Sequence, residues 1–156
     1  MARFAMVLVM LLLFICGCVT PKDDADYGVV KWVADGDTIK LFNGEYVRYV
    51  GVDTPELHHP KKHIYPEYYG KEAKKFNESL VLGKKVRLEF DVERYDKYGR
   101  LLAYVFVDGK FVNEELLKGG YAKTLFIPPN TKYLAKFSVL EEEAKKAKLG
   151  LWSISD

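Results

Sequence analysis

Cysteine is nearly absent from this 156-residue chain, and both copies, Cys16 and Cys18, lie within the first 18 residues. The rest of the sequence therefore excludes a disulfide, a thiolate metal site and a cysteine nucleophile. A fold without disulfides must be stabilised by its hydrophobic core, which a content of 49% apolar residues can supply. The length suits one domain with such a core.

A large excess of charge of either sign is also missing. The chain has 24 basic and 22 acidic residues, and one basic residue, Arg3, lies in the leading segment. Proteins that bind polyanions without sequence preference usually carry a large basic excess. Any contact with a nucleic acid must therefore depend on a local patch. The sequence also lacks internal repeats and low-complexity segments.

No apolar run is long enough for a settled transmembrane helix, which needs about 20 residues. The unbroken run from Phe4 to Cys16 follows Arg3 and precedes Gly17 and Cys18, a pattern typical of an export signal. Residues 15–18 (ICGC) resemble a lipoprotein processing box, in which Cys18 would become the lipidated first residue. A plain signal peptide and an uncleaved anchor are the alternatives.

These patterns predict three regions. Residues 1–18 are expected to be a lipoprotein-type signal peptide, residues 19–26 (VTPKDDAD) a flexible tether, and residues 27–156 one domain. We expect the protein to be exported, and either anchored at the cell surface through lipidated Cys18 or secreted.

Five segments are expected to be strands, because they are rich in apolar residues or alternate them and end at turn signals such as Asn43-Gly44. They are residues 27–34, 38–42, 45–52, 85–93 and 101–107. Three segments have the apolar spacing of helices. They are residues 70–82, 113–117 and 131–149.

Strands in a meander, with a helix joining the third to the fourth, are the layout of an OB-type barrel. We therefore predict an α+β, mainly β fold, a five-stranded OB-fold barrel with three helices. An open five-stranded sheet with helices on one face is the alternative. Asn113 is expected to cap the second helix. The third helix is expected to turn five apolar residues inward: Leu134, Phe137, Leu140, Ala144 and Ala147.

Four carboxylates stand at the ends of the first strands, Asp35, Asp37, Asp53 and Glu56, and Arg48 lies inside the third. Each piece alone is most simply read as a turn or an exposed strand residue. Asp35 and Asp37 are two residues apart, so in an extended chain both point to one side.

Arg48 and Asp53 are five residues apart, which gives them opposite directions in a straight strand. They can meet only if the chain bends, and Gly51 together with Thr54-Pro55 could bend it. The bend would gather Asp35, Asp37 and Asp53 with a backbone carbonyl near Thr54 into an oxygen-only site. Such an irregular set of ligands suits Ca²⁺ better than Mg²⁺, zinc or copper.

Arginine beside such a cation would suit a phosphate group. Arg48 could be joined by Arg100 from the turn 94–100, and both guanidinium groups would stabilise the charge that grows on a phosphate under attack. Glu56 could orient or deprotonate a water molecule. Together, these side chains would support metal-assisted hydrolysis of a phosphodiester.

Several motifs occur in a fixed order along the chain: Asp35-Gly36-Asp37-Thr38, Arg48, Val52-Asp53-Thr54-Pro55-Glu56, His59-Pro60-Lys61-Lys62, Asp96-Lys97-Tyr98-Gly99-Arg100 and Val112-Asn113-Glu114. In this order they resemble the staphylococcal nuclease (thermonuclease) family over about residues 29–152. The resemblance implies an OB-type barrel with three helices and a Ca²⁺-dependent nuclease. Such an enzyme acts on DNA and RNA and leaves a 5′-hydroxyl and a 3′-phosphate. We expect a monomer.

The resemblance also implies metal ligands. Asp37 and Asp53 would be the calcium carboxylates, Thr54 would offer its carbonyl, and Asp35 would act through water.

The same resemblance implies roles at the substrate. Arg48 and Arg100 would bind the scissile phosphate, and Glu56 matches the residue usually assigned as general base. Lys97 and Tyr98 match positions that contact a terminal phosphate of the nucleotide.

Two segments depart from the family pattern. Where the family often offers tyrosines that stack on a base, residues 124–129 offer Phe126 alone, which has the π face that stacking requires. The loop 57–69 is longer, and it either adds a stacking surface or packs over the barrel. His59 and His63 are four apart, as helix-borne zinc ligands would be, but Pro60 disfavours a helix there.

Two other functions are compatible with the same barrel. One is a non-catalytic module that binds nucleic acid or protein, and the other is a structural surface lipoprotein. The presence of Glu56 beside Asp37, Arg48, Asp53 and Arg100 favours the enzyme, because a binding module has little need of Glu56.

Overall fold

The computed structural model describes residues 26–57 and 68–153. The predicted signal peptide, Cys18 and most of the predicted tether lie outside these residues, as do His58, His59, His63 and the pair Lys61-Lys62. Asp26, which was expected to end the tether, is instead the first residue of a strand, where it pairs with Leu88.

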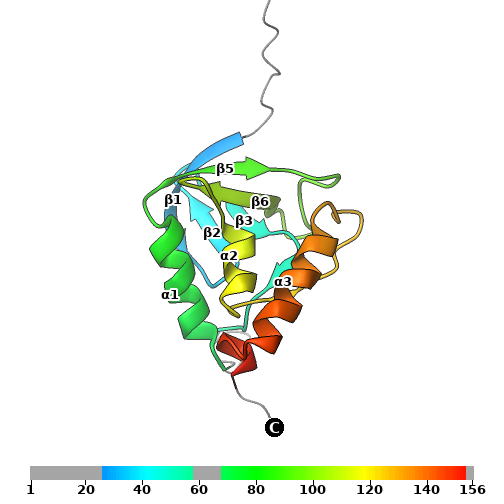
Figure 1. Cartoon of the computed structure of the whole chain (residues 1–156). Coiled ribbons are helices and arrows are strands. Elements are labelled where there is room, and N and C mark those ends of the chain that lie inside the picture. Colours follow the sequence, from blue (N-terminus) through cyan, green and yellow to red (C-terminus); the bar gives the residue numbers. More distant parts are fainter. Residues whose placement is uncertain (1–25, 58–67, 154–156) are drawn as a thin grey trace, which may run out of the picture.

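Five strands form a closed barrel, as the sequence predicted (Figure 1). They are β1 (Asp26–Val33), β2 (Thr38–Leu41), β3 (Tyr46–Tyr49), β5 (Lys85–Glu89) and β6 (Leu101–Val107). The order is β3-β2-β1-β5-β6, with antiparallel neighbours, and a parallel pairing of β3 with β6 closes the barrel. Closure removes the exposed edges that an open sheet would have.

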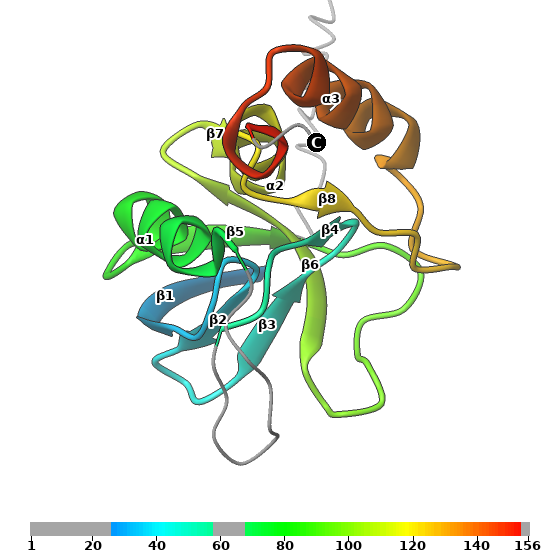
Figure 2. The same ribbon diagram turned by 90° about the horizontal axis from the view of Figure 1, so that it is seen from below.

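Three helices cover one end of the barrel, namely α1 (Gly70–Val81), α2 (Val112–Lys118) and α3 (Leu134–Lys146) (Figure 1). The shorter elements are β4 (Val52–Asp53), β7 (Lys110–Phe111), β8 (Lys123–Thr124) and a 3₁₀ helix, Gly150–Trp152. In both ribbon views α2 lies between α1 and α3 (Figures 1 and 2). Among the described residues, no helix is long and apolar enough to cross a membrane.

The core joins the barrel interior to the helices. Alternating residues of the strands are buried, for example Ile39 and Leu41 in β2, and they meet Leu116 and Leu117 of α2. Phe137 of α3 is fully buried as well. The core thus supplies the stability that the missing disulfides cannot.

The third strand is shorter than predicted, because Gly51 interrupts it. Gly51 has a φ of +77°, which favours glycine, and a Cβ there would lie 2.7 Å from the ring of Phe137. β3 therefore ends at Tyr49, and the chain turns into β4, which pairs with β8 rather than with the barrel. This turn is the bend without which Arg48 and Asp53 could not meet.

Two other elements differ from their predicted ranges by more than one residue. The fourth strand ends at Glu89 rather than residue 93, and the last helix covers Leu134–Lys146 rather than residues 131–149. Ala147, expected to face inward, lies just past the helix and is exposed. Phe137, Leu140 and Ala144 are buried as expected, while Leu134 is half-buried.

Asn113 does not cap α2, because the helix begins one residue earlier, at Val112. Its side chain is instead fully buried and joins β6 to the bend after β3. Oδ1 accepts the N–H of Val105 at 3.0 Å, and Nδ2 donates to the carbonyl of Val50 at 2.8 Å. Asn113 therefore holds the chain beside Gly51 against β6.

Replacing Asn113 with alanine is expected to lower the free energy of unfolding by about 2–4 kcal/mol, because two buried backbone groups would lose their partner. Chemical denaturation measures this change. Asn43→Ala is the control, since Asn43 is exposed and bonds only to Glu45 within its own turn, with an expected loss of about 1 kcal/mol or less. Equal losses in the two variants would contradict the role of Asn113.

Candidate carboxylate and arginine site

The turn between β1 and β2 brings the first two carboxylates together. The N–H of Asp37 donates to Asp35 Oδ1 at 3.1 Å, and the carbonyl of Asp37 accepts the N–H of Tyr49 at 2.9 Å. The two residues thus meet in a turn, as the Asp35-Gly36-Asp37 sequence predicted. A Cβ on Gly36 would lie 2.7 Å from the side chain of Thr54, so only glycine lets Thr54 approach.

Arg48 is 8% exposed and is the centre of the cluster. Its Nη1 donates to the carbonyls of Tyr49 at 2.7 Å and Val52 at 2.6 Å. Its Nη2 lies 2.9 Å from Asp53 Oδ1, and its Nε lies 3.3 Å from Asp37 Oδ1. Arg48 and Asp53 therefore converge across the Gly51 bend, as the sequence required.

Asp37 links the β1–β2 turn to the residue that follows β4. It is 5% exposed, and its Oδ2 accepts both the N–H of Thr54 at 2.8 Å and the Thr54 hydroxyl at 2.9 Å. Its Oδ1 accepts the hydroxyl of Thr38 at 3.0 Å. These bonds fix the backbone of Thr54 next to the two carboxylates.

The cluster has more negative than positive charge, because Asp35, Asp37 and Asp53 surround a single guanidinium group. Burial, together with the charge of Asp37, raises the pKa of Asp35 to about 7, although Arg48 acts in the opposite direction. A cation with oxygen ligands would relieve this repulsion, so the donor set fits a hard cation.

The side chains alone would not enclose a metal. In the described part of the chain, no three histidine, cysteine, aspartate or glutamate side chains form a metal-binding group. A cation at Asp37 and Asp53 would therefore need further oxygens, from the Thr54 carbonyl, water or a bound phosphate.

A buried pair that the sequence reading missed supports the β1–β2 turn from α1. Asn77 and Tyr49 are both fully buried, and the Tyr49 hydroxyl donates to Asn77 Oδ1 at 2.9 Å. Asn77 Nδ2 donates to the carbonyl of Asp35 at 3.2 Å. Burial raises the pKa of Tyr49, so it stays a neutral donor. The sequence did contain a sign of this pair, because Asn77 is a polar residue on the inward face of a predicted helix.

Arg100 belongs to a second turn, which Asp96 organises. Asp96 Oδ1 accepts the N–H groups of Tyr98 at 2.8 Å and Arg100 at 3.0 Å, and Oδ2 accepts Arg100 Nε at 2.7 Å. Although partial burial acts in the opposite direction, these bonds hold the pKa of Asp96 below its usual value. The Tyr98 ring lies 5.6 Å from the Arg100 guanidinium.

The parallel pairing of β3 with β6 determines where this turn sits. Arg48 is the register partner of Leu102, two residues after Arg100. Arg100 therefore lies in the turn that leads directly into β6, the strand next to Arg48. Arg48 thus comes from β3, and Arg100 comes from the turn before the neighbouring strand β6.

A protein-family model described as "Staphylococcal nuclease homologue" matches residues 46–154. The chain belongs to the staphylococcal nuclease family. Endonuclease YncB of Bacillus subtilis (strain 168) is 53% identical over 126 residues, which are 78% of this chain and 59% of that protein. Thermonuclease of Staphylococcus intermedius is 44% identical over 127 residues, which are 80% of this chain and 74% of that protein.

A second B. subtilis relative, the SPbeta prophage-derived endonuclease YokF, is 52% identical over 124 residues, which are 76% of this chain and 41% of that protein. The chain thus spans about half the length of these two B. subtilis relatives. The family match covers Arg48, Asp53 and Arg100 but begins after Asp35 and Asp37. Asp37 is tied to the matched segment by its contacts with Arg48 and Thr54, and Asp35 by the bond that its carbonyl accepts from Asn77.

The remaining predicted site residues come from three other segments of the chain. Glu56 is exposed, and its backbone is fixed at the start of α1, where a Cβ on Gly70 would lie 3.0 Å from the Glu56 carbonyl. Lys97 is exposed and its Nζ lies 5.1 Å from the Tyr98 ring. Phe126 is exposed just after β8. The structure therefore joins Asp37 and Asp53 directly to Arg48 and places Lys97, Tyr98 and Arg100 together on a second turn.

Proposed function

We propose that the chain is a Ca²⁺-dependent nuclease that hydrolyses DNA, RNA or both and leaves 5′-hydroxyl and 3′-phosphate ends. The observation that carries the proposal is the convergence of Asp37 and Asp53 on Arg48, which combines oxygen ligands with a phosphate-binding group. Membership of a family with endonuclease and thermonuclease relatives supports it.

Asp37 and Asp53, with the Thr54 carbonyl, would hold the ion, and Asp35 would act through water. When bound, Ca²⁺ would neutralise part of the charge on the phosphate. The carbonyls of Tyr49 and Val52 hold Nη1 of Arg48, so the guanidinium is oriented before substrate arrives. A preoriented donor loses little energy to reorganisation as charge develops.

Arg100 would donate to the same phosphate from the turn that leads into β6. Its Nε is bound to Asp96, which fixes the plane of the guanidinium. Glu56 would accept a hydrogen bond from the attacking water, and either orient it or remove its proton. Lys97, Tyr98 and Phe126 would bind the nucleotide beside the cut.

A cleavage assay tests this function. Residues 19–156 are incubated with single-stranded DNA and with RNA in Ca²⁺, in Mg²⁺ and in a chelator. We expect cleavage in Ca²⁺ and none in the chelator, with end-group analysis giving 5′-hydroxyl and 3′-phosphate products. Binding without cleavage in Ca²⁺ would support the non-catalytic module instead.

We also propose that the protein is exported and anchored at the cell surface through lipidated Cys18. Replacing Cys18 with serine is expected to move the protein from the membrane fraction to the soluble fraction or the medium, because the lipid attachment atom would be lost. Immunoblots of fractionated cells measure this shift, and Cys16→Ser is the control. Unchanged fractionation of Cys18→Ser would contradict lipidation.

A further inference from the structure

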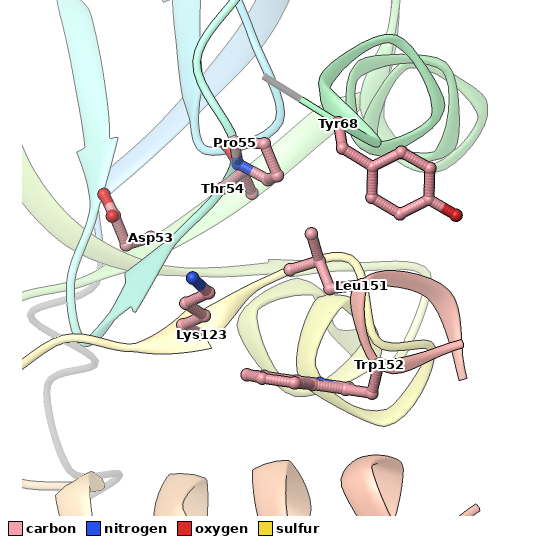
Figure 3. A pocket seen from close by; sticks show the side chains of 7 residues that line it. All are labelled: Asp53, Thr54, Pro55, Tyr68, Lys123, Leu151 and Trp152. Carbon is pink, nitrogen blue, oxygen red and sulfur yellow. The ribbon is translucent and has the colours of Figure 1, made fainter. Parts of the chain in front are cut away.

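A pocket of about 280 Å³ lies between Asp53, Tyr68 and the C-terminal 3₁₀ helix (Figure 3). Asp53, Thr54 and Pro55 form one wall, and Tyr68, at the start of α1, forms another. Lys123, Leu151 and Trp152 complete the lining. The pocket shares Asp53 and Thr54 with the proposed site, so a molecule bound in it would contact the residue that pairs with Arg48.

The fold fixes all sides of this pocket. Asp53 and Lys123 face each other in the β4–β8 pairing. The N–H of Leu151 donates to the carbonyl of Gly120 at 2.8 Å, which holds the 3₁₀ helix against the end of α2. The hydroxyl groups of Tyr68 and Ser153 lie 3.3 Å apart and join α1 to the C-terminal segment.

The lining combines aromatic rings with a single cation. Lys123 Nζ extends between Asp53 and Leu151, and lies 5.9 Å from the centre of the Trp152 ring (Figure 3). Lys145 of α3 lies 4.8 Å from the same ring and supports it. Tyr68 is 53% exposed and its ring lies 5.5 Å from that of Tyr69.

Tyr69 in turn belongs to a supported aromatic row. Its ring stacks at 5.5 Å on Tyr121, which stacks at 4.2 Å on Phe76 of α1. The aromatic wall of the pocket is thus backed by α1 rather than by solvent. Proteins bind single-stranded nucleic acids by stacking bases on aromatic side chains and by placing basic side chains near the phosphates. The pocket offers both kinds of group.

We propose that this pocket is a second nucleotide subsite, in which Tyr68 and Trp152 contact a base and Lys123 contacts a phosphate. It would receive the nucleotide on the opposite side of the scissile phosphate from the one at Lys97 and Tyr98. The turn between β5 and β6 that carries those two residues lies well away from the 3₁₀ helix in both ribbon views (Figures 1 and 2). This subsite rests on the proposed nuclease function.

Binding in a chelator tests the pocket without catalysis. In the full chain, Trp32→Phe leaves Trp152 as the only tryptophan, and its fluorescence is followed during titration with a single-stranded oligonucleotide. We expect a saturable change. Adding Tyr68→Ala should raise Kd about 5- to 100-fold, and Lys123→Gln should lower the slope of log affinity against log salt by about 0.7.

Matched variants control for nonspecific effects. Tyr27→Ala removes a tyrosine of equal exposure on β1, and Lys110→Gln removes an exposed lysine on β7. Both should leave Kd and the salt slope unchanged. An unchanged Trp152 signal, or equal effects of Tyr68→Ala and Tyr27→Ala, would overturn the subsite.

A cleavage map distinguishes failure of the subsite from failure of the nuclease function. With an oligonucleotide that has one abasic position, the full chain should cut poorly at the bonds on both sides of the missing base. In Tyr68→Ala, the missing base should no longer reduce cleavage at one of these two bonds, while cleavage at the other bond should stay reduced. Cleavage that ignores the abasic position in the same way in both proteins would overturn the subsite alone, whereas a chain that cuts nothing in Ca²⁺ would overturn the nuclease function.

Discussion

Replacing Arg100 with alanine is expected to lower kcat by a factor of at least about 10²–10³, with little change in KM. The reason is that Arg100 would donate to a phosphate whose negative charge grows during attack, so that its contribution is largest in the transition state. Stability should change by less than about 1 kcal/mol, since the ion pair with Asp96 is partly exposed. Steady-state kinetics on a short oligonucleotide, together with chemical denaturation, measure both quantities.

Two further variants define what Arg100 does. Arg100→Lys should recover only a small part of the lost rate, because an ammonium group lacks the planar pair of donors. Arg94→Ala removes an exposed arginine from the same turn, where it pairs with Asp26, and should leave kcat unchanged. A loss confined to KM in Arg100→Ala would mean that the residue only binds substrate.

Replacing Arg48 with glutamine is expected to lower both stability and rate. Asp37 and Asp53 would lose their shared partner and repel each other, and two backbone carbonyls would lose a donor. Removing one member of a buried ion pair costs about 3–5 kcal/mol of unfolding free energy. The cleavage rate should fall by a factor of at least about 10².

Ca²⁺ separates the two effects of this substitution. If the carboxylates bind the ion, Ca²⁺ should restore part of the stability of Arg48→Gln without restoring its rate. Arg87→Gln is the control, since Arg87 pairs with Glu89 away from the site, and it should lose about 1 kcal/mol or less. A variant that retains both stability and rate would contradict the position of Arg48 at the centre of the site.

The barrel and much of the cluster could be predicted because they depend on local patterns. Alternating strands, the Asn43-Gly44 turn and the helix after the third strand predicted the closed five-stranded barrel. The position of Gly51 predicted the bend that joins Arg48 to Asp53. The expectation was that Gly51, together with Thr54-Pro55, could bend the chain, and the structure has the bend, with a left-handed φ at Gly51.

What could not be predicted depends on contacts between distant segments. Asn113 was taken for a helix cap, because sequence alone does not reveal that Val50 and Val105 would lie on either side of it. Asn77 and Tyr49 are 28 positions apart and meet only after α1 packs on the barrel. The pocket at Lys123 and Trp152 likewise exists only because β8 pairs with β4.

The central claim is that Asp37, Asp53 and Arg48 form one site for calcium and phosphate. Calorimetric titration of Ca²⁺ into residues 19–156, with and without a nucleoside 5′-phosphate, tests it most directly. We predict one ion per chain, tighter binding when the nucleotide is present, and loss of the ion in Asp37→Asn. Absence of Ca²⁺ binding, or binding that neither the nucleotide nor Asp37→Asn changes, would contradict the claim.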